Sequence, residues 1–101
     1  MRPKTRPEGS DPVLHLMVAL IDFGAVGKSR REVVEALKAR GMGTQVHYIP
    51  VHRQPYYRNL SGPLDLPGAE AWYARCLSLP LYPGMEDRDV ATVAAALKDV
   101  L

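Results

Sequence analysis

A ten-residue run, Val13 to Asp22 (VLHLMVALID), is almost continuously apolar and constrains the fold of this 101-residue chain more than any other feature. Its length suits a β-strand buried on both faces, as in a sheet covered by helices. The run is far shorter than the ~20 apolar residues that cross a bilayer. His15 is the lone polar residue well inside it, and we expect that histidine to be a hydrogen-bonded structural residue.

The clearest local signals predict a helix over residues 29–40. Ser29 and Glu32 have the S-x-x-E spacing of a capping box, in which each side chain bonds a free backbone N–H of the first turn. Gly41 then suits the left-handed position that ends a helix. One apolar stripe between these ends predicts the buried face of the helix: Val33, Val34 and Leu37.

Weaker patterns predict the remaining elements. Residues 43–48 alternate in strand fashion up to Pro50, which cannot continue a ladder. A helix is predicted over residues 67–77, a short strand over 78–81, and a third helix from the acidic start at 86–89. The expected fold class is a small α/β (α+β) domain, with helices on a three-stranded sheet.

Length and composition exclude several classes of protein. We expect one domain over residues 13–101, preceded by a flexible lead-in over 1–12 that is rich in proline and charge. The net charge of +2 comes without a basic stripe, which argues against nucleic acid as a partner. No signal peptide or membrane segment is present, so the expected location is cytoplasmic. Cys76 is the single cysteine, and we expect it to be buried and structural.

Polar and aromatic side chains gather in residues 43–58 (GTQVHYIPVHRQPYYR), unlike the bland patterns elsewhere. A metal site at His47 and His52 lacks the third and fourth ligands that zinc needs. Two interpretations stay open: a structural elbow, or a polar wall that binds a sugar or phosphate. Residues 23–28 (FGAVGK) lack the first half of a phosphate-binding loop, so we do not assign them that role.

Two longer runs, KARGMGTQVHYIPVHRQPYYR and PGAEAWYARCLSLPLYPGMEDRDVATVAAAL, resemble the C-terminal domain of the DegT/DnrJ/StrS aminotransferases. The likeness extends from about Leu14 to the C-terminus. The segments Gln45–Tyr48 and Ile49–His52 point most closely to the branch making UDP-4-amino-4,6-dideoxy-N-acetyl-β-L-altrosamine, a pseudaminic acid precursor. The resemblance implies a fold type I enzyme that depends on pyridoxal 5'-phosphate (PLP). Such an enzyme moves an amino group, usually from glutamate, to a nucleotide-linked 4-keto sugar in polysaccharide or nonulosonic acid biosynthesis.

The same resemblance implies the site and the partners. In that family the small domain closes one side of the substrate cleft, and the enzyme is a homodimer with a large N-terminal domain. The substrate-binding residues that it implies are Gln45, Val46, His47, Tyr48, His52, Arg53 and Gln54. For His47, a structural role at the edge of the core stays open.

Transamination also needs a lysine that forms a Schiff base with the cofactor. The four lysines here, Lys4, Lys28, Lys38 and Lys98, do not lie in a context that resembles the cofactor lysine. We therefore expect no catalytic residue, no covalently held PLP and no turnover by this chain alone. Its start at Met1 fits a split gene, a truncated reading frame or an independently encoded half. The alternative function is a free-standing small-molecule binding or regulatory domain.

Overall fold

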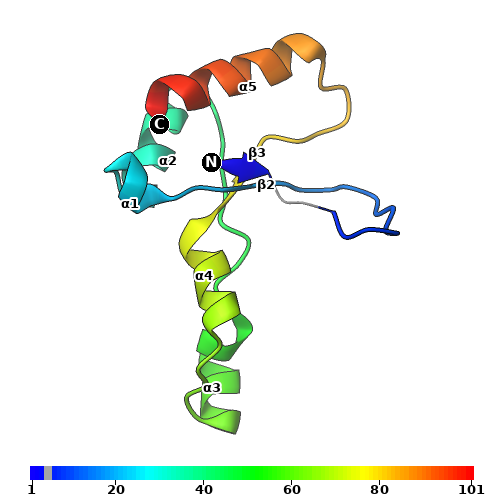
Figure 1. Ribbon diagram of the computed structural model, residues 1–101. Helices are drawn as coiled ribbons and strands as arrows, with labels where there is room; N and C mark the ends of the chain where they lie inside the picture. Colours follow the sequence, from blue (N-terminus) through cyan, green and yellow to red (C-terminus); the bar gives the residue numbers. More distant parts are fainter. Residues whose placement is uncertain (4–5) are drawn as a thin grey trace.

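The computed structural model describes residues 1–3 and 6–101, so Lys4 lies outside the described residues. Figure 1 shows a small α/β domain with a layer of helices over a sheet and a helical arm that extends away from it. In chain order the elements are β1 (Arg2–Pro3), β2 (Met17–Leu20), α1 (Phe23–Val26), α2 (Arg30–Ala39), the 3-10 helix η1 (Val51–Arg53), α3 (Pro55–Ser61), α4 (Pro67–Arg75), β3 (Cys76–Leu79) and α5 (Asp87–Val100).

The sheet is antiparallel, in the order β1-β2-β3. In the β2–β3 ladder, Ala19 lies opposite Leu77, and Val18 lies opposite Ser78. Because successive side chains in a strand point to opposite faces, these two pairs lie on opposite faces of the sheet. The predicted fold class, a small α/β domain with a small sheet and helices, is confirmed.

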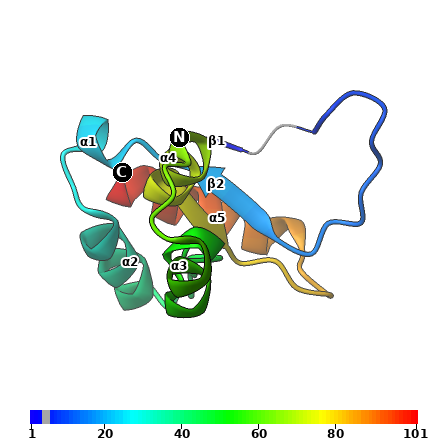
Figure 2. The same ribbon diagram turned by 90° about the horizontal axis from the view of Figure 1, so that it is seen from below.

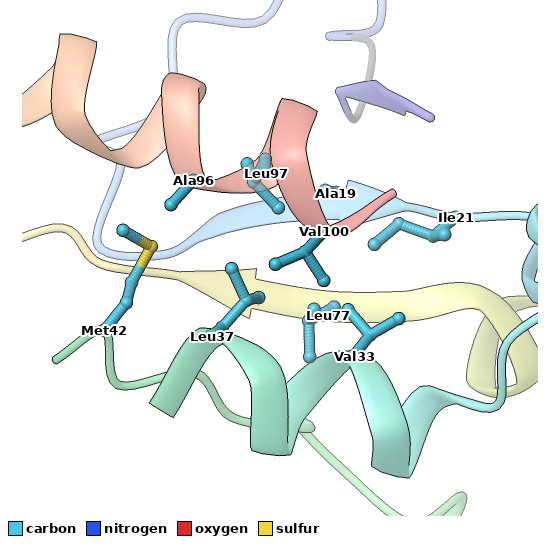
Figure 3. Close-up of a cluster of buried hydrophobic side chains, with 9 residues drawn as sticks. All are labelled: Ala19, Ile21, Val33, Leu37, Met42, Leu77, Ala96, Leu97 and Val100. Carbon is cyan, nitrogen blue, oxygen red and sulfur yellow. The ribbon is translucent and has the colours of Figure 1, made fainter. Parts of the chain in front are cut away.

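The hydrophobic core lies between the sheet and helices α2 and α5, as Figure 3 shows. The two helices pack against each other and cover the sheet face that carries Ala19 and Leu77. Full burial of a branched apolar side chain stabilises a fold by about 1.5–3 kcal/mol, so this cluster is the main source of stability. Its members are Ala19, Ile21, Val33, Leu37, Met42, Leu77, Ala96, Leu97 and Val100.

Local chemistry sets both ends of α2, as predicted. The backbone N–H of Glu32 donates to Ser29 Oγ at 3.2 Å, and the Ser29 N–H donates to Glu32 Oε2 at 2.7 Å. At the other end, Gly41 has a φ of 76°, and the Met42 N–H donates back to the Leu37 carbonyl at 3.0 Å. This Schellman ending turns Met42 into the core.

The first strand is shorter than predicted. β2 covers Met17–Leu20 instead of residues 13–22. The reason is the length of its partner, because β3 contributes only four residues between α4 and Pro80. A ladder of four pairs leaves the first half of the apolar run outside the strand. His15, which we expected to be a hydrogen-bonded structural residue, is exposed and makes no side-chain hydrogen bond within the described residues.

The other predicted strands also differ in detail. Residues 43–48 form a single bridge, Gln45 to Ser78, rather than a strand, and the third strand is β1 near the N-terminus. β3 begins two residues before the predicted strand at 78–81, since α4 ends at Arg75. The predicted turn at 23–28 contains the short helix α1. The division into a lead-in over 1–12 and a domain over 13–101 stays a prediction.

The helical arm comprises η1, α3 and α4, and it projects from the sheet on the side away from α5 (Figures 1 and 2). It gives the molecule an elongated outline, with principal extents of 47 × 36 × 23 Å. α4 runs without a break into β3, so the arm is continuous with the sheet. Of the helices in residues 1–3 and 6–101, none is long and apolar enough to cross a membrane.

Candidate functional site

The segment Gln45–Tyr48 lies along the free edge of β3. The Gln45 N–H donates to the Ser78 carbonyl at 3.1 Å, and the Ser78 N–H donates to the Gln45 carbonyl at 2.7 Å. Val46 packs against the hydrophobic core, while the side chain of Gln45 is exposed. The bridge therefore fixes the backbone of the segment and leaves polar side chains accessible at the sheet edge.

His47 is half-buried and is held by two contacts. Its Nδ1 lies 2.9 Å from the hydroxyl oxygen of Ser78. Its ring meets the ring of Tyr48 edge-on, with 4.8 Å between the centroids and 73° between the planes. Tyr48 itself is exposed. The pair places an oriented imidazole beside an accessible phenol.

A hollow of about 350 Å³ lies next to His47. Val18 and Trp72 line it together with His47, and residues 6–7 and 12–17 complete the lining. Since Val18 lies on the sheet face opposite the α2–α5 layer, the hollow lies on that face as well. Its size is near the lower end for small-molecule sites, and its mixture of apolar walls with an imidazole is typical of them.

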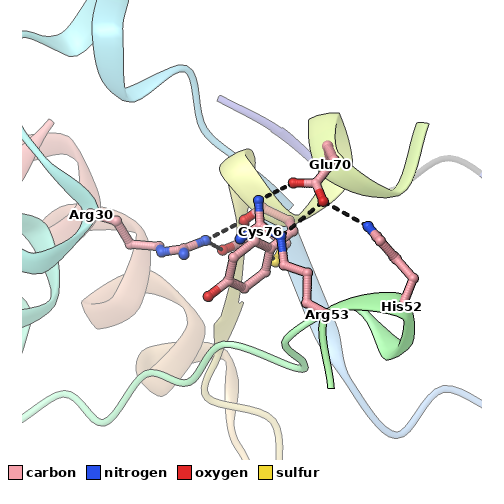
Figure 4. A network of polar contacts seen from close by, with 6 residues as sticks. Arg30, His52, Arg53, Glu70 and Cys76 are labelled. Carbon is pink, nitrogen blue, oxygen red and sulfur yellow. Dashed lines mark hydrogen bonds and ion pairs between the residues drawn. The ribbon is translucent and has the colours of Figure 1, made fainter. Parts of the chain in front are cut away.

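A second polar cluster ties the helical arm together, as Figure 4 shows. Both carboxylate oxygens of Glu70, in α4, accept hydrogen bonds from Arg53. Arg53 Nε donates to Oε1 at 2.8 Å, and Nη2 donates to Oε2. His52 Nε2 also lies 2.8 Å from Oε1. The Arg53 hydrogen bond is the largest cause that lowers the pKa of Glu70, which keeps this acceptor ionised at neutral pH.

Tyr73 links this cluster to α2. The Arg53 guanidinium lies 5.1 Å from the centre of the Tyr73 ring, and the Arg30 guanidinium lies 4.7 Å from it. Arg30, at the start of α2, also donates to the Tyr73 carbonyl and, at 3.4 Å, to the Cys76 carbonyl. Cation–π contacts and charge-assisted hydrogen bonds thus join the arm to α2.

A second hollow, of about 500 Å³, opens beside the arm cluster. His52, Arg53, Glu70 and Arg58 supply its polar lining, and Pro63 and Leu64 supply the apolar lining. Arg58 makes no side-chain hydrogen bond or ion pair within the described part of the chain, so its charge is available to an anion. The Gln54 amide instead donates to the Ile49 carbonyl of its own loop at 3.5 Å.

The structure divides the predicted site residues into two groups. Residues 45–48 lie at the sheet edge, and residues 52–54 lie at the base of the arm. Sequence reasoning missed the partners, Ser78 and Glu70, because they are 31 and 18 residues away from the histidines that they contact. Arg58 belongs to the polar segment that the sequence singled out, but not to the predicted site residues. Whether any of these residues binds substrate stays a prediction.

The two histidines do not form the start of a metal site in this fold. His47 contacts Ser78 and His52 contacts Glu70, so each has a different partner. Among residues 1–3 and 6–101, no group of three His, Cys, Asp or Glu side chains is arranged to hold a metal ion. Cys76 is buried, as predicted, and burial raises the pKa of its thiol.

The fold is similar to part of solved aminotransferase structures. TlmJ from Streptoalloteichus hindustanus, an aminotransferase, superposes with a TM-score of 0.80 at 27% identity over 98% of this chain and 25% of that chain. Helicobacter pylori PseC, an aminotransferase involved in the biosynthesis of pseudoaminic acid, gives 0.74 at 27% identity over 85% of this chain and 23% of that chain.

Sequence comparison gives the family. Residues 1–98 match the DegT/DnrJ/EryC1/StrS aminotransferase family, and the chain therefore belongs to it. It is 46% identical over 90 residues to the spore coat polysaccharide biosynthesis protein SpsC of Bacillus subtilis (strain 168), covering 86% of this chain and 23% of SpsC. The chain thus spans about a quarter of the length of the relatives that it matches.

The structure describes three of the four lysines of this chain, Lys28, Lys38 and Lys98. The Lys28 amine donates to the Val100 carbonyl at the end of α5, while Lys38 and Lys98 are exposed near the ends of their helices. Within the described ranges, no lysine lines the hollow beside His47 or the hollow beside Arg58. The putative sugar aminotransferase Spr1654 of Streptococcus pneumoniae, solved in a PLP-form, matches this chain over only 23% of its own length.

Proposed function

We propose that this chain forms one wall of the substrate cleft in a PLP-dependent aminotransferase that aminates a nucleotide-linked 4-keto sugar. The amino donor is glutamate, and the product enters cell-surface polysaccharide or nonulosonic acid biosynthesis. Support comes from the family match over residues 1–98 and from the names of the relatives, which include a spore coat polysaccharide protein and a pseudoaminic acid enzyme. The PLP, its lysine and the other walls belong to a large domain and a second subunit.

The observation that carries the proposal is the arrangement at the edge of β3. Gln45 and Tyr48 are exposed there, and His47 is oriented beside a hollow. An amide, a phenol and an imidazole can each exchange hydrogen bonds with sugar hydroxyls, and the amide both donates and accepts. Val46 anchors this segment to the core.

The arm supplies positive charge for the nucleotide. Arg58 and Arg53 line the second hollow, where they match the anionic oxygens of a diphosphate. Arg53 is already paired with Glu70, so Arg58 contributes the less compensated charge. His52 and Gln54 hold the shape of this part of the wall through Glu70 and the Ile49 carbonyl.

Titration of the 101-residue chain with UDP-N-acetylglucosamine tests the sugar wall. We expect amide NMR signals of residues 45–48 to shift with a Kd of about 1 mM or weaker, because one wall supplies only part of the contacts. Tyr48→Phe should weaken the effect, whereas Tyr82→Phe, a second exposed tyrosine at a different hollow, should not. Shifts with glutamate alone and none with the nucleotide sugar would support the alternative, a free-standing regulatory domain.

A second experiment tests the proposal that the cofactor lysine lies in the large domain and not in this chain. The chain is incubated with PLP, reduced with borohydride and examined by mass spectrometry. We expect no adduct specific to one lysine, since the Lys28 amine is bonded to the Val100 carbonyl and the other described lysines are exposed near helix ends. A stoichiometric adduct at a single lysine would contradict the proposal that the cofactor lysine lies elsewhere.

A further inference from the structure

We propose that Ser78 is a positioning residue, which fixes the neutral ring of His47 in the tautomer that carries its proton on Nε2. The ring then presents an N–H donor to an acceptor oxygen of the sugar. This inference rests on the proposed function only for the identity of that acceptor. The tautomer itself follows from the contacts of Ser78.

The backbone of Ser78 is fixed from both sides. It pairs with Val18 of β2 on one edge of β3 and forms the bridge with Gln45 on the other edge. A strand residue that is paired on both edges has little freedom beyond the rotation of its own side chain. The hydroxyl of Ser78 is therefore a fixed point against which the His47 ring, two residues beyond Gln45, is aligned.

The burial of Ser78 decides which atom of the pair donates. Ser78 is only 5% exposed, so its O–H needs an acceptor within the protein. Among the residues that the structure describes, His47 Nδ1, at 2.9 Å, is the acceptor within its reach. If Nδ1 carried the proton, the buried O–H would lose this acceptor, which is unfavourable. Ser78 Oγ–H therefore donates to Nδ1, and the ring proton lies on Nε2.

The fixed tautomer has a consequence for recognition. With Nδ1 occupied, Nε2 is the ring nitrogen left for a ligand, and His47 lines the hollow beside Trp72. An N–H donor selects acceptor oxygens, such as a keto, hydroxyl or phosphate oxygen, and disfavours ligand groups that can only donate. The edge-on contact with Tyr48 restrains the ring further. A donor aligned before binding also lowers the entropy lost on binding.

Long-range ¹H–¹⁵N NMR of the histidine rings in the full 101-residue chain tests the proposal directly. Spectra are recorded near pH 8.5, roughly two units above the ordinary pKa of a free histidine. The chain has three histidines, and His47→Gln assigns the signal of His47. We expect the pattern of the Nε2–H tautomer at His47 in the unmodified protein.

Two variants separate positioning from simple packing. Ser78→Ala removes the hydroxyl but keeps the backbone bridge, and we expect the Nδ1–H fraction of His47 to rise about tenfold. Ser78→Thr keeps the hydroxyl and should restore the original pattern. His52 is the internal control, because its Nε2 faces the Glu70 carboxylate. Its ring proton should stay on Nε2 in all variants. An amide spectrum of each variant reports whether the fold is intact.

The outcomes distinguish this inference from the proposed function. The role of Ser78 would be overturned by an Nδ1–H tautomer of His47 in the unmodified protein, a result that needs no variant. It would also be overturned by an unchanged tautomer ratio in folded Ser78→Ala. If the tautomer responds as expected but UDP-N-acetylglucosamine leaves the His47 signals unmoved, Ser78 still positions the ring, and the proposed sugar contact is what fails. With both intact, Ser78→Ala should weaken nucleotide-sugar binding about fivefold and Ser78→Thr by less than about twofold.

Discussion

Truncation of Leu37 to alanine tests the core that supports the candidate site. Leu37 is 0% exposed and belongs to the cluster between α2, α5 and the sheet, where Leu77 and Leu97 also lie (Figure 3). The change removes three carbon atoms from a packed interior, and the cavity adds to the lost burial. Comparable truncations cost about 2–5 kcal/mol, and we expect about 3 kcal/mol here.

That cost is large relative to the total stability of a chain this small. A domain of about 100 residues is stable by roughly 5–10 kcal/mol, so the variant should stay folded with a reduced margin. With a denaturant slope of about 1.5 kcal/mol per molar urea, the midpoint should fall by about 2 M. In thermal unfolding, the Tm should fall by about 15 °C.

Urea unfolding followed by circular dichroism measures this shift. Leu60→Ala is the matched control. It is the same change of leucine to alanine, but Leu60 lies on helix α3, where its side chain is 73% exposed. Its midpoint should correspond to a change within about 0.5 kcal/mol. Equal losses in the two variants, or a loss below about 1 kcal/mol at Leu37, would refute the assignment of the core to the α2–α5 face.

Two further predictions concern titratable groups. Burial raises the pKa of the Cys76 thiol, which is 1% exposed, so an aromatic disulfide reagent should react slowly until urea unfolds the chain; fast reaction of the native protein at neutral pH would contradict its burial. Arg53 lowers the pKa of Glu70, so the stabilisation is present above the unfolded carboxyl pKa and is lost as the pH falls through the lower folded pKa. Glu70→Gln should therefore flatten the decline of the urea midpoint below about pH 5, and an unaltered decline would refute this.

The helices were predictable because their signals are local. The contacts at both ends of α2 join residues no more than five positions apart, such as Ser29 and Glu32. Both partners of each contact therefore fall within one short stretch of sequence. The acidic start of α5 is a similar case: the Glu86 N–H donates at 2.9 Å to Asp89 Oδ2, three residues further on. Such interactions depend on spacing alone, so a pattern identifies them.

The strands were less predictable because their limits depend on distant partners. β2 is four residues long because β3 is four residues long, and β3 begins where α4 happens to end. Nothing in the apolar run at 13–22 indicates where β2 begins or ends. Residues 43–48 have strand character, yet their pairing with β3 stops at one bridge. Pairing between segments some 30 residues apart is a property of the tertiary fold.

The contacts within the candidate site could be predicted only in part, for a similar reason. Residues 43–58 differ from the strand and helix patterns of the chain in their polar and aromatic composition. This difference is visible in the sequence without any knowledge of the fold. The pattern gave no sign that the histidines have separate partners, since Ser78 and Glu70 lie in segments of ordinary strand and helix character. Residue types indicated a binding surface, whereas only the register of β3 shows how His47 is oriented.

Two anchors hold the segment that we propose as a binding wall. His47 is attached to Ser78 on β3, while His52 and Arg53 are attached to Glu70 on α4. Because α4 continues directly into β3, the two anchors lie on consecutive elements within residues 67–79. The loop is therefore tied to the sheet at one point and to the arm at the other. A surface held by a helix and a strand is positioned before a ligand arrives, which would favour the sugar binding that we propose.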